Sequence, residues 1–211
     1  CFLGAHFFLN NIYLKMKLKT KEIKAIGRTL NIVRIGTSGS VQADIPVDSF
    51  VISEKSIGCD GVLRFYANNE SVCDHPFEEA FIRHCRWTPS AARPYVVNAD
   101  PGLADRLYDE EHTIKGVTLT AVGFYGPQGR VLRLPLAMPG INDRITAFRY
   151  EGYKVTNYEM ESAAITGLCN LLGHRAATIC LIIANRINGD ASADYHSYMN
   201  KLIRYTLEKL S

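Results

Sequence analysis

At residues 155–165 the chain reads Val155-Thr156-Asn157-Tyr158-Glu159-Met160-Glu161-Ser162-Ala163-Ala164-Ile165, and it changes there from a β-prone run to an apolar helix. Two carboxylates, those of Glu159 and Glu161, lie at the junction. Burying a carboxylate is costly unless it is paired, but the free N–H groups and the dipole at a helix start favour a negative charge. Acidic residues are also common in solvated first turns. The spacing alone therefore fits either a solvated helix start or a ligand site.

Length and composition bound the fold class. The chain has 211 residues, 47% of them hydrophobic and 21% charged, which is ordinary for one α/β domain with a sizeable core. The net charge of +3 is too small to indicate a nucleic-acid or membrane partner. No apolar run approaches the length of a membrane-spanning helix. We therefore expect a cytoplasmic protein that binds small molecules, anions among them.

The cysteines indicate a reduced protein without a metal centre. There are six, scattered and without a C-x-x-C pair, and Cys169 and Cys180 sit in apolar runs as small buried side chains do. Four residues that cluster in the sequence are conceivable metal ligands, but their spacing fits no common zinc pattern: Cys73, His75, His84 and Cys85. No metal site is predicted.

β-prone and helical segments alternate along the chain without a repeat or a linker, which predicts a single α/β domain. The run Ala176–Ala184 is apolar throughout, as is typical of a central strand covered on both faces. Ligands of open α/β sheets bind beyond the carboxyl ends of strands. Strands are expected at 30–35, 50–53, 61–66, 94–97, 117–122 and 176–184, and helices at 101–111, 142–150, 163–172 and 194–210.

A small-residue loop, Gly36–Ser40, is expected after the strand at 30–35. Its N–H and hydroxyl groups, together with the permanent charge of Arg34, form a natural cradle for an anion. The Gly-x-x-Gly pattern is also typical of a plain turn, and it is neither a dinucleotide-binding fingerprint nor a Walker loop. The segment is therefore an anion-site candidate that needs support from elsewhere in the chain.

A second candidate follows the strand at 117–122, where the chain reads Phe124-Tyr125-Gly126-Pro127-Gln128-Gly129-Arg130. A Gly-Pro turn here brings an aromatic ring, an amide and a guanidinium close together, a set that suits a planar polar ring. A solvent-exposed hairpin tip explains the same residues equally well. Asn185 and Arg186, at the end of the apolar run, form a further strand-end pair.

Four segments resemble, in order and context, the hexameric nucleoside phosphorylases, and among these most closely the uridine phosphorylases: Arg34–Gln42, Phe124–Arg130, Asn157–Ala163 and Ile182–Arg186. The similarity spans roughly residue 31 to the C-terminus. It implies a three-layer α/β/α fold with a central mixed β-sheet. The implied ligand residues are Arg34 and Thr37 for phosphate; Thr37, Met160 and Glu161 for ribose; and Phe124, Gln128, Arg130, Tyr158 and Glu159 for the base, with Arg34, Thr37 and Arg186 catalytic.

The resemblance also implies the chemistry, which is phosphorolysis of a nucleoside without a metal or a cofactor, phosphate being the co-substrate. Purine-cleaving relatives place an aspartate after the last core strand, where this chain has Asn185 and Arg186. An arginine is not a useful proton donor at neutral pH, so a pyrimidine nucleoside, uridine, is the expected substrate. A homo-oligomer is expected, as in the dimer-based hexamers of the family.

The resemblance fails at the N-terminus. A Gly-Asp-Pro-x-Arg phosphate loop and a further arginine precede the Arg34 segment in uridine phosphorylases, and neither occurs in residues 1–33. We therefore expect residues 1–30 to be an irregular remnant of a truncated region that lacks the first strand–helix unit, and residues 31–211 to be the nucleoside phosphorylase domain. The chain is expected to cleave uridine by phosphorolysis, or to be an inactive fragment of an enzyme that does so. Three alternatives stay open: a purine nucleoside phosphorylase, a nucleosidase that uses water, and a non-catalytic nucleoside-binding paralogue.

Overall fold

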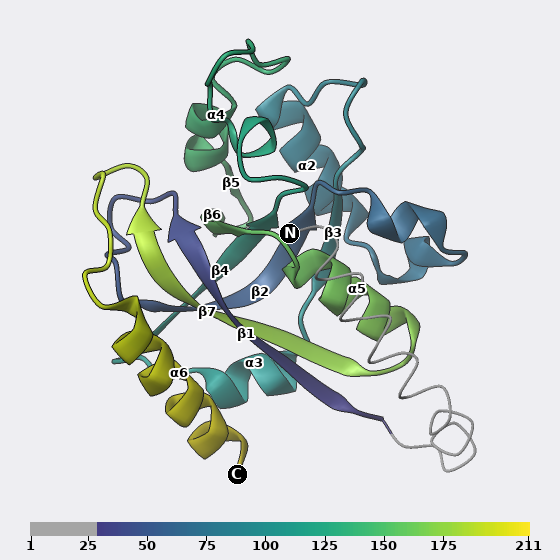
Figure 1. The fold of residues 1–211 in the computed structure, drawn as a ribbon. Helices are drawn as coiled ribbons and strands as arrows, with labels where there is room; N and C mark the ends of the chain where they lie inside the picture. The colour runs from purple at the N-terminus through teal and green to yellow at the C-terminus, as the bar shows by residue number, and fades with distance from the viewer. Residues whose placement is uncertain (1–28) are drawn as a thin grey trace.

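The computed structural model describes residues 29–211, so the predicted N-terminal remnant lies, up to residue 28, outside the described residues. A mixed sheet with helices on both of its faces organises the described part (Figure 1). Its strands are β1 (Asn31–Ser40), β2 (Phe50–Gly58), β3 (Tyr95–Asn98), β4 (Thr113–Thr120), β5 (Arg149–Tyr150), β6 (Tyr153–Glu159) and β7 (Arg175–Asn185). The predicted α/β class and mixed sheet are confirmed.

The strands nearly close on themselves. Over residues 29–211 the order is β1-β7-β2-β4-β6-β5, with β3 paired to β2. Parallel pairs join β1 to β7, β2 to β4 and β4 to β6, whereas β2 and β7 are antiparallel. The last residues of β1 also pair with the last residues of β6, Gly39 opposite Tyr158. Consequently the carboxyl ends of β1, β4, β6 and β7 meet at one place.

Helices cover the sheet on both sides (Figure 1). On one face α3 (Pro101–Leu107) and α6 (Tyr195–Leu210) bury Leu107 and Leu202 against Ile179 and Leu181 of β7. α5 (Ser162–Leu171) covers the other face, and α2 (His75–Cys85) and α4 (Ile141–Ala147) extend that layer. Short 3-10 turns complete the fold: η1 (Val62–Phe65), η2 (Asn69–Val72) and η3 (Gly126–Gln128). No helix in the described range combines the length and the apolar character needed to cross a membrane.

Helix α3 shows how local sequence sets an element. Asp100 accepts a hydrogen bond from the Leu103 N–H at 2.9 Å, and Pro101 takes the first helical position, where its missing N–H costs nothing. The predicted start is therefore confirmed. The helix ends at Leu107, earlier than expected.

Two local predictions were wrong. The expected strand at 61–66 is the turn η1, because Gly61 adopts a left-handed conformation (φ 71°) and Asp60 accepts a hydrogen bond from the Val62 N–H. The expected loop Gly36–Ser40 belongs to β1 and pairs with β7 through to Asn185, with one bulge at Gly39. At Gly36 a side chain would meet the Arg34 guanidinium, because a Cβ there would lie 2.6 Å from Nη1 of Arg34.

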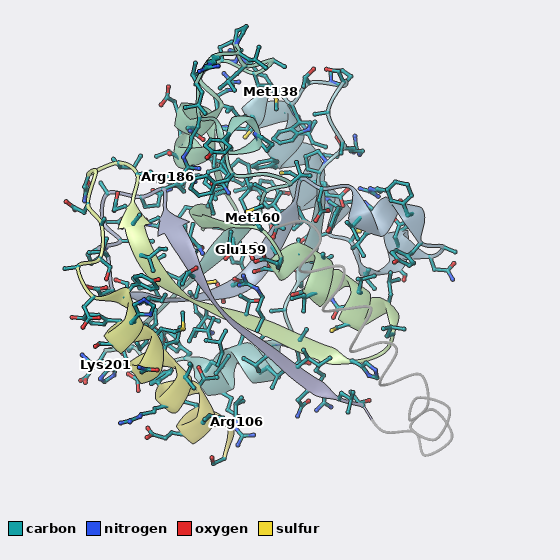
Figure 2. All side chains as sticks on the ribbon, viewed as in Figure 1. Arg106, Met138, Glu159, Met160, Arg186 and Lys201 are labelled. Carbon is teal, nitrogen blue, oxygen red and sulfur yellow. The ribbon has the colours of Figure 1, made fainter. Side chains whose placement is uncertain are left out.

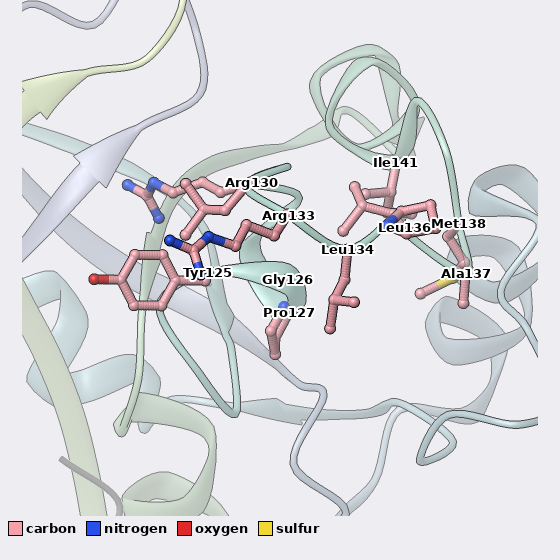
Figure 3. Close-up of a pocket in the computed structure, with 12 residues that line it drawn as sticks. Tyr125, Gly126, Pro127, Arg130, Arg133, Leu134, Leu136, Ala137, Met138 and Ile141 are labelled. Carbon is pink, nitrogen blue, oxygen red and sulfur yellow. The ribbon is translucent and has the colours of Figure 1, made fainter.

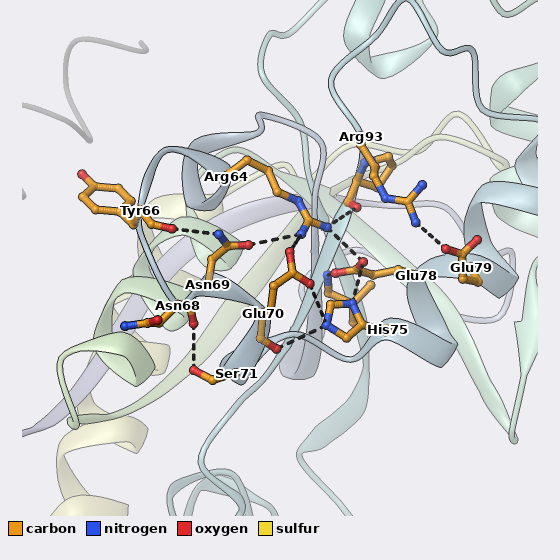
Figure 4. A network of polar contacts seen from close by, with 12 residues as sticks. Arg64, Tyr66, Asn68, Asn69, Glu70, Ser71, His75, Glu78, Glu79 and Arg93 are labelled. Atoms are coloured by element: carbon orange, nitrogen blue, oxygen red, sulfur yellow. Dashed lines mark hydrogen bonds and ion pairs between the residues drawn. The ribbon is translucent and has the colours of Figure 1, made fainter.

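A polar network joins α2 to its surroundings (Figure 4). The side chain of Glu78 is 1% exposed and lies 3.0 Å from Nη2 of Arg64 and 3.2 Å from Nδ1 of His75. It also accepts a hydrogen bond from the Val96 N–H of β3 at 3.1 Å. A buried carboxylate needs such partners, so the network fixes η1, α2 and β3 together.

His75 gives this network a pH dependence. The hydrogen bond to Glu78, more than any other contact, raises the pKa of His75, so its stabilising effect is complete below the unfolded-state pKa of about 6.5 and is lost as pH rises through the folded-state pKa. We expect His75→Gln to lower the urea midpoint of unfolding more at pH 5.5 than at pH 8.5. Equal losses at the two pH values would contradict this.

Candidate functional site

The meeting point of the strand ends brings the predicted segments together. Gly39 of β1 lies opposite Tyr158 of β6 and opposite Ala184 of β7, and Thr120 of β4 lies opposite Glu159. Figure 2 shows Glu159, Met160 and Arg186 in this region. Two clusters of polar side chains occupy it, and each is built around arginine.

The first, here called the Arg34 cluster, consists of Arg34, Thr120, Glu159 and Glu161. The Glu159 side chain is 1% exposed. Its Oε1 accepts a hydrogen bond from Oγ1 of Thr120 at 2.5 Å, and its Oε2 accepts the N–H groups of Glu161 and Ser162, each at 2.8 Å. The carboxylate thus satisfies free donors at the start of α5, where the helix dipole favours it.

Arg34 bridges the two acids of this cluster. Its Nη2 lies 3.1 Å from Oε2 of Glu159 and 2.5 Å from Oε2 of Glu161. Its Nη1 donates to Sγ of Cys180 at 3.2 Å. Burial of the guanidinium works against its charge, but Cys180 and the two glutamates outweigh that effect and raise its pKa. One guanidinium faces two carboxylates, which leaves the cluster with an excess of one negative charge.

The second, the Gln128 cluster, consists of Phe124, Gln128, Arg130, Tyr158 and Arg186. Oε1 of Gln128 accepts a hydrogen bond from Nη1 of Arg130 at 2.7 Å and another from Nη2 of Arg186. Nη1 of Arg186 also bonds the Gln128 carbonyl oxygen at 3.1 Å. Because guanidinium groups only donate, they fix which end of the buried amide faces them, and the amide nitrogen is directed elsewhere.

Aromatic rings support both guanidinium groups of the Gln128 cluster. The Cζ atom of Arg130 lies 3.9 Å from the centre of the Phe124 ring, and that of Arg186 lies 4.5 Å from the centre of the Tyr158 ring. The Tyr158 hydroxyl donates to Asn142 at 3.2 Å, and Asn142 in turn donates to the Gln128 carbonyl at 3.2 Å. Asn142 thus connects α4 to the cluster.

The Gln128 cluster carries positive charge without a carboxylate to balance it. Within residues 29–211 neither Arg130 nor Arg186 forms an ion pair. Burial lowers the pKa of both guanidinium groups, and Arg130 lowers that of Arg186 further. Such a site favours a ligand with carbonyl oxygens or with negative charge.

Three of the predicted ligand residues either form no side-chain hydrogen bond within the described range or bond to other parts of the protein. Thr37 and Met160 make no side-chain hydrogen bond to any described residue, so their ribose and phosphate roles stay predictions. Glu159, predicted beside the base, is engaged by Thr120, by α5 and by Arg34. Its role in base binding also stays a prediction.

The sequence did not identify Thr120, Asn142 and Cys180 as site residues, and it assigned no individual role to Asn185. Thr120 ends β4 directly opposite Glu159, a pairing that only the sheet register reveals. The side chain of Asn185 donates to the carbonyl oxygens of Gln42 and Ile45 and accepts the N–H groups of residues 187 and 188. Asn185 therefore holds two loops together, and its hydrogen-bonding capacity is used.

A cavity of about 830 Å³ lies on the loop that follows η3, and we call it the loop cavity (Figure 3). One segment, residues 125–141, supplies its whole lining, which is mostly apolar. Figure 3 shows Tyr125, Arg130 and Arg133 facing Leu136, Met138 and Ile141 across it. The lining includes Arg130 of the Gln128 cluster, but neither Gln128 nor any residue of the Arg34 cluster. The loop cavity therefore adjoins the candidate site, which the two polar clusters form.

The four residues considered as metal ligands do not assemble. His75 bonds Glu78, and His84 bonds the carbonyl oxygen of Arg144. Burial raises the pKa of the Cys73 and Cys85 thiols to about 12, which disfavours the thiolate that a metal needs. Across residues 29–211, no group of three or more His, Cys, Asp or Glu side chains is arranged to hold a metal ion.

Known proteins resemble the chain over most of its length. The sequence profile of the phosphorylase superfamily matches residues 19–206. Uridine phosphorylase of Thermococcus kodakarensis is 27% identical over 81% of this chain and 53% of its own length. Uridine phosphorylase A of Schistosoma mansoni is 36% identical over 75% of this chain and 49% of its own length. The chain thus spans about half the length of these curated relatives.

A solved structure shares the fold. The crystal structure of Trypanosoma brucei nucleoside phosphorylase, described as showing uridine phosphorylase activity, superposes with a TM-score of 0.74 at 24% identity. The superposition covers 85% of this chain and 63% of that chain. The expected nucleoside phosphorylase fold is therefore confirmed.

Glu159 is buried with several donors and Glu161 is partly exposed, so their substitution is expected to change the free energy of unfolding by different amounts. Glu159→Gln places an amide NH2 among donors in a buried site and is expected to lower the free energy of unfolding by about 2–4 kcal/mol. Glu161→Gln changes a side chain that is 30% exposed, and a loss below about 1 kcal/mol is expected. Urea denaturation measures both. Equal losses would show that Glu159 does not anchor α5.

Proposed function

The chain belongs to the phosphorylase superfamily, and from this premise we propose that it cleaves uridine with inorganic phosphate to uracil and ribose 1-phosphate. The observation that carries the proposal is the Gln128 cluster, in which two guanidinium groups contact a buried amide and have no carboxylate partner among residues 29–211. The relatives named uridine phosphorylase support it.

Uracil suits the Gln128 cluster. Its ring presents two carbonyl oxygens, and as the glycosidic bond breaks these oxygens gather the negative charge of the departing base. Arg130 and Arg186 stabilise that charge, the side chain of Gln128 bonds the edge of the ring, and Phe124 packs on its face. A purine would need an acid to protonate its ring, and Asn185 and Arg186, which stand where purine-cleaving relatives place an aspartate, do not supply one: the Asn185 amide is neutral and holds two loops, and an arginine is not a useful proton donor at neutral pH.

The Arg34 cluster suits the sugar and the phosphate. The ribose hydroxyls donate to Glu161, Met160 packs against the sugar, and Arg34 and Thr37 hold the phosphate. A phosphate oxygen then bonds C1′ while the bond from C1′ to the base breaks and its electrons leave with the base. The bound phosphate's charge stabilises the cationic sugar, so positioning and electrostatics supply the catalysis, and no metal, cofactor or protein nucleophile takes part.

The proposal includes two further properties, self-association and a location in the cytoplasm. The exposed apolar side chains of Val131, Leu132 and Leu134, which are 65%, 69% and 80% exposed, favour contact with another protein surface. A homo-oligomer built from dimers, up to a hexamer, is proposed. All five cysteines in the described range are free, as in proteins of reducing compartments.

Uracil release from uridine, followed by absorbance, tests the activity. Release is expected to require phosphate, and Arg130→Ala is expected to lower kcat/KM about 100-fold because it removes a donor to the charged leaving group. Arg133→Ala, which removes a charge from the same loop, is the matched control and should stay within about twofold.

Each failure of this assay has a distinct meaning. Release that does not depend on phosphate would identify a nucleosidase. Binding of uridine without release would identify a non-catalytic nucleoside-binding protein. An Arg130→Ala variant as active as the wild type would remove the Gln128 cluster from the mechanism.

A further inference from the structure

The two carboxylates that share Arg34 are held very differently. Glu159 has an almost fully buried side chain that Thr120 and two backbone N–H groups hold in addition to Arg34. The side chain of Glu161 is 30% exposed, and among the described residues its carboxylate contacts Arg34 alone, at 2.5 Å. Glu161 therefore loses one interaction if it turns away, whereas Glu159 would leave several donors unpaired.

The charge of the cluster makes this difference matter for an incoming anion. Arg34 faces two carboxylates through Nη2, and its Nη1 is directed at the Cys180 thiol. A phosphate that approaches Arg34 would meet an excess negative charge in a part-buried site, where repulsion is stronger than in water. Arg34 binds phosphate well only after one carboxylate has moved, and Glu161 is the one that is free to move.

We propose that Glu161 is an exchangeable partner of Arg34, and that this exchange makes the nucleoside and phosphate bind cooperatively. The inference rests on the proposed function, in which Glu161 accepts the ribose hydroxyls and Arg34 binds phosphate. Ribose hydroxyls replace the guanidinium as donors to Glu161, and the vacated Nη2 becomes available to a phosphate oxygen. Glu159 stays in place and keeps Arg34 oriented.

Thermodynamic linkage makes the coupling reciprocal. Whatever factor the nucleoside contributes to phosphate affinity, phosphate must contribute to nucleoside affinity. While Glu161 is paired with Arg34, its charge thus acts against phosphate binding to the empty site, and a bound sugar removes that effect. Consequently the empty site has a lower affinity for phosphate than the nucleoside-bound site.

The first test uses inorganic phosphate alone, titrated calorimetrically into the 211-residue chain at pH 7.5. Glu161→Gln removes the competing charge, and about a tenfold gain in phosphate affinity over the wild type is expected. Glu208→Gln, an exposed position on α6, removes the same charge elsewhere and should leave the affinity within about twofold. Equal phosphate affinity in Glu161→Gln and the wild type, or no binding to either, overturns the proposal.

The second test adds pseudouridine, whose carbon–carbon glycosidic bond resists phosphorolysis. Saturating pseudouridine should tighten phosphate binding to the wild type more than about fivefold and leave Glu161→Gln unchanged. Its 2′,3′-dideoxy derivative should not tighten it. If Glu161→Gln gains phosphate affinity but pseudouridine does not bind, the exchangeable contact stands and the proposed nucleoside substrate fails. Equal tightening by the dideoxy derivative overturns the exchange.

Discussion

The ion pair of Arg34 with Glu159 is the interaction on which the rest of the site depends. Glu159 ends β6 and begins α5, and its carboxylate holds the helix N–H groups, Thr120 of β4 and the guanidinium of β1 at once. Three strands and a helix therefore share one buried negative charge. A buried carboxylate is tolerated only when hydrogen-bond donors surround it. The contacts of Glu159 therefore fix both the position of Arg34 and the relative positions of the three strands and the helix.

The Gln128 cluster depends on the same closure of the sheet. Gly39 of β1 lies opposite both Tyr158 of β6 and Ala184 of β7, and Arg186, which follows β7, stacks on Tyr158 at these strand ends. The two clusters thus differ in charge although they are neighbours. The Arg34 cluster has an excess of carboxylate and suits hydroxyl donors. The guanidinium groups of the Gln128 cluster have no ion-pair partner in the described part of the chain and suit carbonyl oxygens. That polarity matches a nucleoside with its sugar on one side and its base on the other.

The sequence was informative about composition-driven features and about motifs, and less so about register. The apolar run at 176–184 and the Asp100-Pro101 start were predicted because they depend on local chemistry. Thr120, Asn142 and Cys180 were not, because their contacts cross between strands and helices far apart in the chain. Gly36–Ser40 resembled a loop since small residues are typical of turns, yet the segment ends β1, and the glycine at position 36 leaves space for the Arg34 guanidinium.

The central claim is that the two clusters form one nucleoside site, and a crystal structure of the chain with bound uridine tests it most directly. The account predicts the ribose hydroxyls on Glu161, the base edge on Gln128 and Arg130, and Glu159 still bonded to α5. Uridine bound in the loop cavity at residues 125–141, with both clusters unchanged, would contradict it.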